Sequence, residues 1–303
     1  MNLRQTTGDE QAFRQSSGLD AALQRLTDEL LTVCRGADEP LRPGLEALVA
    51  ARGKRLRPSL AYLCWHMSDE PRLDVLPLML MLELMHTASL IHDDIVDGAD
   101  TRRGTLALHM LVGERAAAQG ADYLLACAME RLHVYRGTGI NELLTGVSLA
   151  MCQGELWQRD ALAGRQEQTE ETYFVQIWRK TAALIAASCR AGAIAAGMDE
   201  ETAARLDRFG ENLGMAFQLR DDLMDFTGQG LGGKPVGLDE KAGLLTLPWL
   251  RNMAGADKTE AARQTEGLIR ARTAEAVAAL SGLKGPEAAA LMALAEGLAK
   301  RVD

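Results

Sequence analysis

The sequence predicts an all-α fold, and three observations support this prediction. The chain of 303 residues is rich in alanine, leucine and methionine, which favour helices, whereas only 4 % of its residues are aromatic. Apolar residues recur three and four positions apart along most of its length, which is the period of a helix. No segment alternates convincingly between apolar and polar residues as a half-buried strand would.

The expected helices follow from this period in chain order. They cover residues 20–34, 75–89, 122–135, 171–197, 200–226 and 258–283. Glycine and proline lie at the joints between the periodic segments. Because the chain shows neither a repeat of fixed period nor a long linker, we expect a single domain over residues 1–303.

Composition and charge exclude several classes of protein. The net charge of −9 argues against a nucleic-acid partner. The polar residues 1–15 do not resemble a signal peptide, and the longest apolar run, residues 75–85, is too short to cross a bilayer. The five cysteines show neither metal-binding spacing nor a disulfide framework. We therefore expect buried thiols in a cytoplasmic protein without a transmembrane segment.

The apolar helix at residues 75–89 is expected to end in three acids. They are Asp93, Asp94 and Asp97, and Gly98 comes directly after them. Acids are disfavoured at a helix C-terminus, where the macrodipole already presents negative charge. Carboxylates beside a buried helix also cost desolvation free energy unless another group neutralises them. One such cluster by itself would still be more typical of a charged, solvated helix end.

A second cluster repeats the first. Asp221, Asp222 and Asp225 close the helix at residues 200–226, again before a glycine. In each cluster the spacing of four places the outer two acids on one helical face, with the middle acid about 100° around the helix. Two copies favour a functional role over a solvated helix end. Because hard oxygen ligands suit Mg²⁺, we expect the clusters to face each other across a cleft and hold a polyphosphate through metal.

Basic residues accompany the two acidic clusters. They are Arg102, Arg103, Lys180, Lys234 and, in the motif “GKRLRP” at 53–58, Lys54, Arg55 and Arg57. Arg102 and Arg103 follow the first cluster at a distance that a short loop can fold back. Guanidinium groups fit phosphate oxygens well, although a basic run alone is as often a solvated face. An acidic metal site and a separate basic site would hold two different diphosphates.

Ordered motifs make the chain similar to a known family. Beyond “GKRLRP” they are “HTASLIHDDIVDGADTRRG” (86–104), “GELWQ” (154–158), “KTAAL” (180–184), “LGMAFQLRDDLMD” (213–225) and “GKPVGLDEKAGLLTLP” (233–248). From about residue 45 to its C-terminus the chain resembles the trans-prenyl diphosphate synthases of the polyprenyl synthetase family. The resemblance implies an isoprenoid synthase bundle of about ten or more helices around a deep central cavity, assembled as a homodimer.

The resemblance also implies a reaction and a cofactor. The family joins an allylic diphosphate, such as dimethylallyl, geranyl or farnesyl diphosphate, to isopentenyl diphosphate. Mg²⁺, expected as three ions with the bound diphosphate, neutralises the departing group while the allylic C–O bond ionises. The released diphosphate takes the final proton, so no separate general base is expected.

The same resemblance assigns roles to the site residues. The metal ligands are Asp93, Asp97, Asp221 and Asp225, and Asp94 and Asp222 support them or bind through water. The residues that hold the allylic diphosphate are Arg102, Lys180 and Lys234. Those that hold isopentenyl diphosphate are Lys54, Arg57, His86 and Arg103. Those that face the developing carbocation are Thr181 and Gln218.

Four polar residues need a separate interpretation. A lone histidine on an apolar helix is more often a satisfied core residue. His86, however, lies seven residues before Asp93, two turns along nearly the same face, so we favour the role in binding isopentenyl diphosphate. His92 receives no ligand role. Glu155 and Gln158 either support the site or are ordinary polar positions on a packed helix, and both alternatives stay open.

A glycine-rich stretch resembles nucleotide-binding motifs. The residues “GQGLGGKP” (228–235) match G-x-G-x-x-G, and they match a P-loop up to its last position, where Pro235 stands. Both motifs require a preceding strand, whereas a helix is expected here. We interpret the stretch as a mobile loop that brings Lys234 over the diphosphate.

Departures from the family pattern bear on the product. Arg52 stands where a second glycine is frequent, Leu106-Ala107 replaces the usual Pro-Thr, and Leu244 replaces a common lysine. Long-chain synthases often have an apolar residue at this last position, so Leu244 favours products of C20 or longer.

The helix before the first cluster also bears on product length. In the family, a bulky aromatic residue five positions before the first aspartate stops chain growth. Ala88 and Ser89 are small here, although they would equally suit close helix packing, and Met85 is an alternative floor. We therefore expect the cavity to stay open past Ala88.

Two other functions compete with chain elongation. A class I terpene cyclase shares an aspartate-rich metal site but normally lacks the second cluster and the isopentenyl-binding cations. A catalytic or non-catalytic subunit of a heteromeric synthase is the other alternative, although non-catalytic subunits usually lose aspartates and all six are present. Consumption of isopentenyl diphosphate by the purified chain alone discriminates among these functions.

Overall fold

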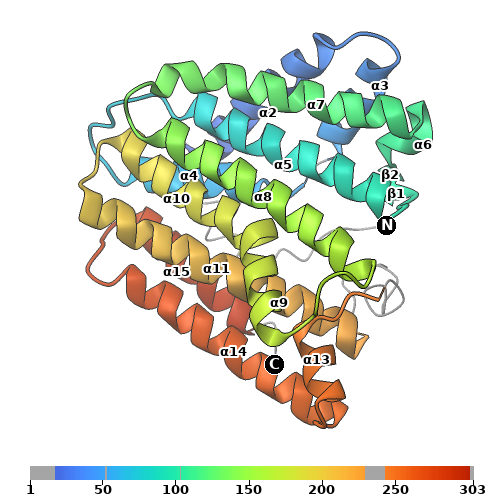
Figure 1. The fold of residues 1–303 in the computed structure, drawn as a ribbon. Helices are drawn as coiled ribbons and strands as arrows, with labels where there is room; N and C mark the ends of the chain where they lie inside the picture. Colours follow the sequence, from blue (N-terminus) through green and yellow to red (C-terminus); the bar gives the residue numbers. More distant parts are fainter. Residues whose placement is uncertain (1–17, 52, 103, 229–242, 301–303) are drawn as a thin grey trace. The chain divides into compact units, whose positions relative to one another are not determined.

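Helices make up most of the chain in this computed structural model, which describes residues 18–51, 53–102, 104–228 and 243–300 (Figure 1). In chain order the elements are α2 (Leu19–Arg35), α3 (Leu41–Ala50), α4 (Leu56–His66), α5 (Leu76–Val96), β1 (Thr101–Arg102), β2 (Thr105–Leu106), α6 (Leu108–Val112), α7 (Glu114–Arg131), η1 (Leu132–Tyr135), α8 (Ile140–Leu162), α9 (Glu170–Ile177), η2 (Trp178–Ala182), α10 (Ala183–Ala196), α11 (Glu200–Thr227), α13 (Leu247–Met253), α14 (Lys258–Ala279) and α15 (Pro286–Lys300). The predicted all-α fold class is confirmed.

Two compact units divide the described chain. The first unit comprises residues 18–141 and 191–198, and the second comprises residues 142–190 and 199–300. The first aspartate cluster and the “GKRLRP” motif belong to the first unit, whereas the second cluster and Lys180 belong to the second unit.

The central helix of the first unit is α5. Helices α2, α4 and α7 all pack against it (Figure 1), so every side chain from Leu78 to Met85 is buried. At its start the Tyr135 hydroxyl donates to the Asp74 carbonyl oxygen (2.7 Å) and accepts from the Leu78 backbone N–H (2.9 Å). Burial raises the pKa of Tyr135, so this hydroxyl keeps the proton that the first of these bonds requires.

In the second unit α11 packs along α14, and it also contacts η2 (Figure 1). Two glycines one turn apart on α11 allow its close approach to η2 and α10. A Cβ on Gly210 would lie 2.7 Å from the Cα of Ala186, and a Cβ on Gly214 would lie 2.6 Å from the Cα of Ala182. Both distances are far shorter than a normal contact, so side chains larger than hydrogen do not fit here.

The structure corrects two expectations about local structure. A two-stranded antiparallel hairpin is present, with Thr101 opposite Leu106, and its strands are too short to show an alternating pattern. The segment 171–197 is not one regular α-helix, because the π-helical turn η2 lies between α9 and α10. The apolar helix at 75–89 was expected to end in the first cluster, and α5 does so, since it continues to Val96 and includes Asp93 and Asp94.

The cysteines are only partly as expected. Three are buried free thiols, but Cys127 is half-buried and Cys152 is exposed, which corrects the expectation of five buried thiols. Cys152 lies on an exposed face of α8 that apolar side chains share, and sequence periodicity cannot show whether such a face is covered. Burial raises the pKa of Cys34 to about 12, so this thiol stays protonated and unreactive.

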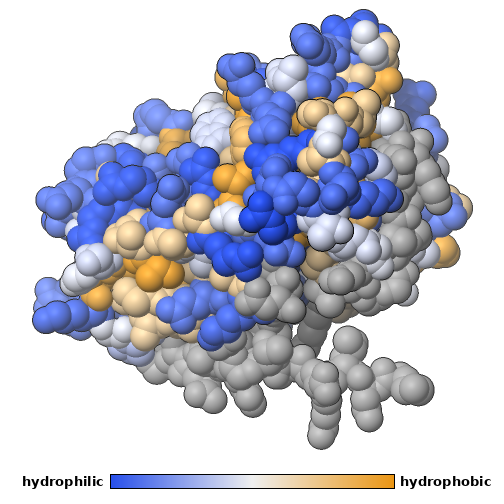
Figure 2. Space-filling view, turned by 90° about the horizontal axis from the view of Figure 1, so that it is seen from below, coloured by the Kyte–Doolittle hydropathy of each residue, from blue (hydrophilic) through white to orange (hydrophobic). Residues whose placement is uncertain are grey.

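The visible surface is mainly hydrophilic. Figure 2 shows hydrophilic residues over most of the described part of the face seen from below, with smaller hydrophobic areas between them. None of the helices in the described ranges combines the length and the apolar character that crossing a membrane requires. The longest of them, α11 with 28 residues, begins with acids in its first turn.

Replacement of Gly210 by alanine should destabilise the fold, because the new Cβ would collide with the backbone of α10. We expect the free energy of unfolding to fall by about 1–3 kcal/mol, measured by urea denaturation. Gly267→Ala on α14 is the matched control, since no atom lies within 4 Å of the position that its Cβ would take. This control should stabilise the helix by about 0.5–1 kcal/mol. Equal stability of Gly210→Ala and the wild type would contradict the close approach.

Candidate active site

The first aspartate cluster lies where α5 ends. Asp93 and Asp94 belong to its last turn, and the backbone N–H of Asp97 donates to the Asp93 carbonyl oxygen (2.8 Å). Gly98 follows with φ 61°, a left-handed conformation that glycine adopts without strain. Asp93 is half-buried and Asp97 is exposed, whereas Asp94 is only 3 % exposed. The cluster therefore consists of two outer acids and one buried middle acid.

Arg102 neutralises the buried middle acid. Its Nε donates to Oδ1 of Asp94 (2.8 Å), and its Nη2 contacts the same oxygen. The β1–β2 hairpin turns the chain back toward α5, and the Thr105 hydroxyl donates to the Arg102 carbonyl oxygen (2.8 Å) within it. The expected return of Arg102 to the first cluster is thus present in the structure.

The second cluster lies in the last two turns of α11. The helix ends at Thr227, and Gly228 caps it in the left-handed region with φ 75°. Asp221 is exposed and Asp225 is half-buried, whereas Asp222 is only 5 % exposed. The division into outer acids and a buried middle acid is therefore the same as in the first cluster.

A hydrogen-bonded chain holds the middle acid of the second cluster. The Tyr173 hydroxyl donates to Oδ2 of Asp222 (2.5 Å), and Nε2 of Gln218 donates to Oδ1 (2.8 Å). Oε1 of Gln218 in turn accepts from the Thr181 hydroxyl (2.8 Å). Three elements, α9, η2 and α11, are therefore connected through one buried carboxylate.

The π-helical turn η2 contains the first three residues, “KTA”, of the motif “KTAAL” (180–184). π-Helical turns within α-helices are frequent at functional sites, because the extra residue redirects neighbouring side chains. Nζ of Lys180 lies 2.8 Å from Oε1 of Glu155 and 2.8 Å from Oε1 of Gln158. The question left open for Glu155 and Gln158 is thus answered in part: both contact an expected diphosphate-binding lysine. Gly154 allows this approach, because its Cβ would lie 3.1 Å from Cγ of Lys180.

The residues expected to hold isopentenyl diphosphate lie on α4 and α5. Lys54 is exposed just before α4, Arg57 is half-buried in its first turn, and His86 is half-buried on α5. Two further expected residues, Arg103 and Lys234, lie outside the described residues, as do Arg52 and most of the glycine-rich stretch.

Sequence reasoning missed two residues of this region. Tyr173 donates to the second cluster, and its position two turns before Lys180 on a mostly apolar helix is a weak signal that could have found it. The Gln168 side chain accepts from the Leu245 backbone N–H (2.8 Å) and donates to the Gly243 carbonyl oxygen (3.0 Å). It therefore holds the segment that carries Leu244, across a separation in sequence that no local pattern reveals.

Comparison with known proteins shows to which family the chain belongs. Residues 38–281 match the model of the polyprenyl synthetase family. The chain is 36 % identical to heptaprenyl diphosphate synthase component 2 of Geobacillus stearothermophilus, over 90 % of this chain and 84 % of that protein. It is also 36 % identical to the chloroplastic solanesyl diphosphate synthase 1 of Arabidopsis thaliana, over 75 % of this chain and 57 % of the plant protein.

A solved structure has the same fold. The polyprenyl synthase of Caulobacter crescentus, complexed with calcium and isoprenyl diphosphate, aligns with a TM-score of 0.85 and 29 % identity, covering 97 % of this chain and 98 % of that one. The chain therefore belongs to the polyprenyl synthetase family and is a chain-elongating prenyl diphosphate synthase.

Proposed function

We propose that this chain joins isopentenyl diphosphate to dimethylallyl, geranyl or farnesyl diphosphate and makes a polyprenyl diphosphate of C20 or longer. One observation carries the proposal: each of two aspartate clusters has a buried middle acid held by side chains from other elements and two more exposed outer acids. In this proposal the more exposed outer acids of both clusters bind the metal ions. A class I terpene cyclase would not need the second cluster or the isopentenyl-binding cations.

The donor set fits Mg²⁺, which the family uses. Asp93 with Asp97, and Asp221 with Asp225, offer hard oxygen ligands four residues apart. Over the described ranges no three acids, histidines or cysteines form a group that could hold an ion unaided. Water and substrate phosphates usually complete the coordination of Mg²⁺, and we propose three ions. Bound Mg²⁺ neutralises the charge that develops on the departing diphosphate.

Cations of the chain hold the two diphosphates in this proposal. Arg102, Lys180 and Lys234 bind the allylic diphosphate, and Lys54, Arg57, His86 and Arg103 bind isopentenyl diphosphate. Because Lys180 contacts Glu155, a diphosphate must compete with this carboxylate for the ammonium group. Until the substrate arrives, the contact with Glu155 would keep the side chain of Lys180 oriented.

Two neutral side chains stabilise the developing carbocation. The Thr181 hydroxyl gives its hydrogen to Oε1 of Gln218, so its oxygen lone pairs are the part of the group that can face a cation. Nε2 of Gln218 is held by Asp222, which fixes the orientation of its amide. Both oxygens thus stabilise positive charge without acting as a general base.

The small side chains of Ala88 and Ser89 on α5 support a long product. Ala88 and Met85 are both buried and lie three residues apart on one face of the helix. We propose that the growing chain runs along this face and passes Ala88. Leu244 favours the same outcome, and two of the related proteins are named as heptaprenyl and solanesyl diphosphate synthases.

An exposed apolar face on α8 supports a homodimer. Leu149 is 60 % exposed and Leu156, two turns later on the same face, is 51 % exposed. Covering such side chains with a second copy of the chain would recover hydrophobic free energy. The relative from Geobacillus stearothermophilus is named as a component 2, so a different partner chain is the alternative. We propose a cytoplasmic enzyme in either case.

The purified chain should convert isopentenyl and farnesyl diphosphates to a product of C20 or longer, and a chelator of Mg²⁺ should abolish this conversion.

Asp93→Asn and Asp221→Asn should each lower kcat by about two orders of magnitude or more, because each removes stabilisation of the leaving group in the transition state. Product formation is followed by mass spectrometry, and the wild type and the variants are compared at the same Mg²⁺ concentration.

Asp28→Asn is the control for the two aspartate variants, because Asp28 is an exposed acid on α2. It should retain the wild-type rate. A wild-type chain that consumes no isopentenyl diphosphate would overturn the proposed function. Near-normal rates in Asp93→Asn or Asp221→Asn would instead overturn the assignment of the metal ligands.

Ala88→Tyr should shorten the product, because the ring would fill the space into which the chain grows. The length distribution is measured by mass spectrometry, and thermal unfolding shows whether the variant is folded. Ala88→Ser, which keeps a small side chain, is the control and should leave the distribution unchanged. A folded Ala88→Tyr enzyme with wild-type products would show that this face of α5 does not limit the chain.

Leu149→Glu should disrupt the homodimer, because a charge would enter the proposed apolar interface. The mass in solution, measured by light scattering after size-exclusion chromatography, should fall toward that of one chain. Met253→Glu on α13 replaces another exposed apolar side chain, which does not belong to the proposed interface, and should leave the mass unchanged. A wild-type chain that is monomeric at assay concentrations would contradict the homodimer.

A further inference from the structure

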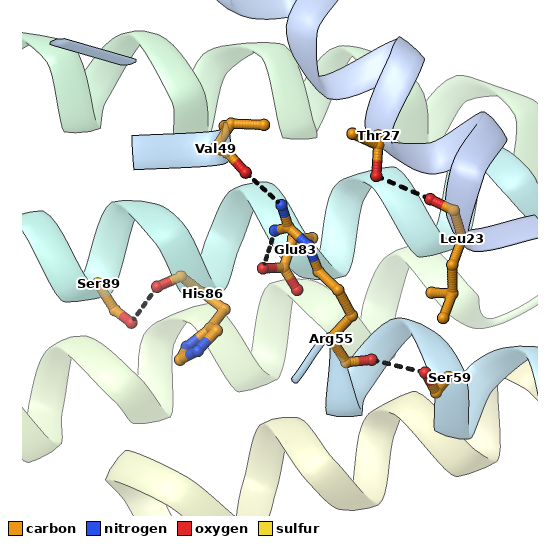
Figure 3. Close-up of polar contacts among 8 residues, drawn as sticks. All are labelled: Leu23, Thr27, Val49, Arg55, Ser59, Glu83, His86 and Ser89. Carbon is orange, nitrogen blue, oxygen red and sulfur yellow. Dashed lines mark hydrogen bonds and ion pairs between the residues drawn. The ribbon is translucent and has the colours of Figure 1, made fainter. Parts of the chain in front are cut away.

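A buried ion pair links the “GKRLRP” motif to α5. Glu83 is the only charged side chain between Asp74 and His86, and it is only 1 % exposed in an otherwise apolar part of the helix. Its carboxylate contacts the guanidinium group of Arg55, whose side chain is 8 % exposed (Figure 3). Within the motif, Arg55 therefore turns its guanidinium group into the interior of the unit, toward α5.

Arg55 connects three elements of the first unit. Its Nη2 donates to the Val49 carbonyl oxygen at the end of α3 (2.9 Å), while its Nη1 contacts Glu83 on α5. Its own carbonyl oxygen accepts from the Ser59 N–H (3.1 Å) and the Ser59 hydroxyl (2.8 Å) in the first turn of α4. Figure 3 shows the guanidinium group lying between the Val49 carbonyl and the Glu83 carboxylate.

The backbone of Arg55 adopts an unusual conformation. Its φ of 50° makes it the one non-glycine residue with positive φ in the described part of the chain. Side-chain-bearing residues rarely adopt this region, and they persist there only when the surrounding contacts determine the conformation. Here those contacts are the ion pair and the bonds to Val49 and Ser59. The pair therefore helps to set the direction in which the chain enters α4.

The geometry points to a role beyond stability. A buried ion pair is often no more stabilising than apolar residues of similar size, so stability by itself does not account for it. Lys54 precedes Arg55 directly, and Arg57 follows two residues later at the start of α4. His86 lies one turn after Glu83 on α5 (Figure 3). Each partner of the pair is thus next to a residue proposed to hold isopentenyl diphosphate.

We propose that Arg55 and Glu83 are positioning residues for isopentenyl diphosphate. They fix the start of α4 against α5, so that Lys54 and Arg57 on one side and His86 on the other are held in one arrangement. This inference rests on the proposed function and assigns no substrate contact to either residue. Its consequence is that loss of the pair weakens the use of isopentenyl diphosphate selectively and leaves the use of the allylic substrate largely intact.

Glu83→Gln tests the proposal, because it keeps the shape of the side chain and removes its charge. We expect the KM for isopentenyl diphosphate to rise roughly tenfold or more, because small misplacements of binding groups are costly. The KM for farnesyl diphosphate should change by less than about twofold. Calorimetry with isopentenyl diphosphate alone should show the same loss of affinity, independently of turnover.

Arg55→Lys is the second variant, and it keeps the experiment decisive if Glu83→Gln does not fold. It retains the positive charge but loses the forked geometry that reaches both Val49 and Glu83, so an intermediate loss of affinity is expected. Leu26→Ala on α2 is the stability-matched control, because it truncates a buried side chain of the same unit. It should lower the melting temperature without changing the ratio of the two KM values.

The outcomes separate the inference from the proposed function. Equal increases in both KM values, or a selective effect of Leu26→Ala, would show a general loss of structure and overturn the positioning role. Unchanged affinity for isopentenyl diphosphate in folded Glu83→Gln or Arg55→Lys would overturn it as well. A wild-type chain that neither binds nor consumes isopentenyl diphosphate would instead overturn the proposed function on which the inference rests.

Discussion

Buried carboxylates must be compensated, and this constraint organises the structure around the candidate site. A carboxylate taken out of water costs free energy unless donors or a cation meet it. Asp94 is met by Arg102 from the β1–β2 hairpin, and Asp222 is met by Tyr173 from α9 and by Gln218 one turn away on α11. Because most of these partners come from other elements, the same bonds that compensate the charge also determine how those elements lie. The outer acids of each cluster are left more exposed, which is the condition for binding metal.

The same constraint acts on the basic motif. Glu83 would be a costly residue in the middle of α5 if Arg55 did not reach it, and Arg55 holds a left-handed backbone conformation in doing so. One cation of “GKRLRP” is therefore paired within the protein, whereas Lys54 and Arg57 are the ones proposed to bind a ligand. A run of basic residues in a sequence thus need not act as one group, since burial divides them by role.

Close packing of α11 against α10 and η2 positions polar side chains beside the second cluster. Gly210 and Gly214 let α11 approach α10 and η2 without intervening side chains, and Gln218 follows one turn later on the same face. At that point it meets Thr181, which the π-helical turn carries. The positions of Thr181 and Gln218, which are proposed to face the carbocation, therefore depend on the two glycines in the preceding turns of α11. Backbone proximity and the hydrogen-bonded chain to Asp222 act together in this arrangement.

Much of the fold and of the candidate site could be predicted from sequence because the relevant signals are local. Helical period, the i to i+4 spacing of the outer acids and the ordered motifs of the family depend on residues near one another in the chain. Three features could not be predicted in this way: which face of α8 is covered, the bond from Tyr173 to Asp222, and the Arg55–Glu83 pair. Their partners lie up to 49 residues apart in sequence, as Tyr173 and Asp222 do. By itself, therefore, the sequence determined the helices, the clusters and the family. Only the tertiary structure decided which charge is buried and what compensates it, because burial and pairing arise when distant segments meet.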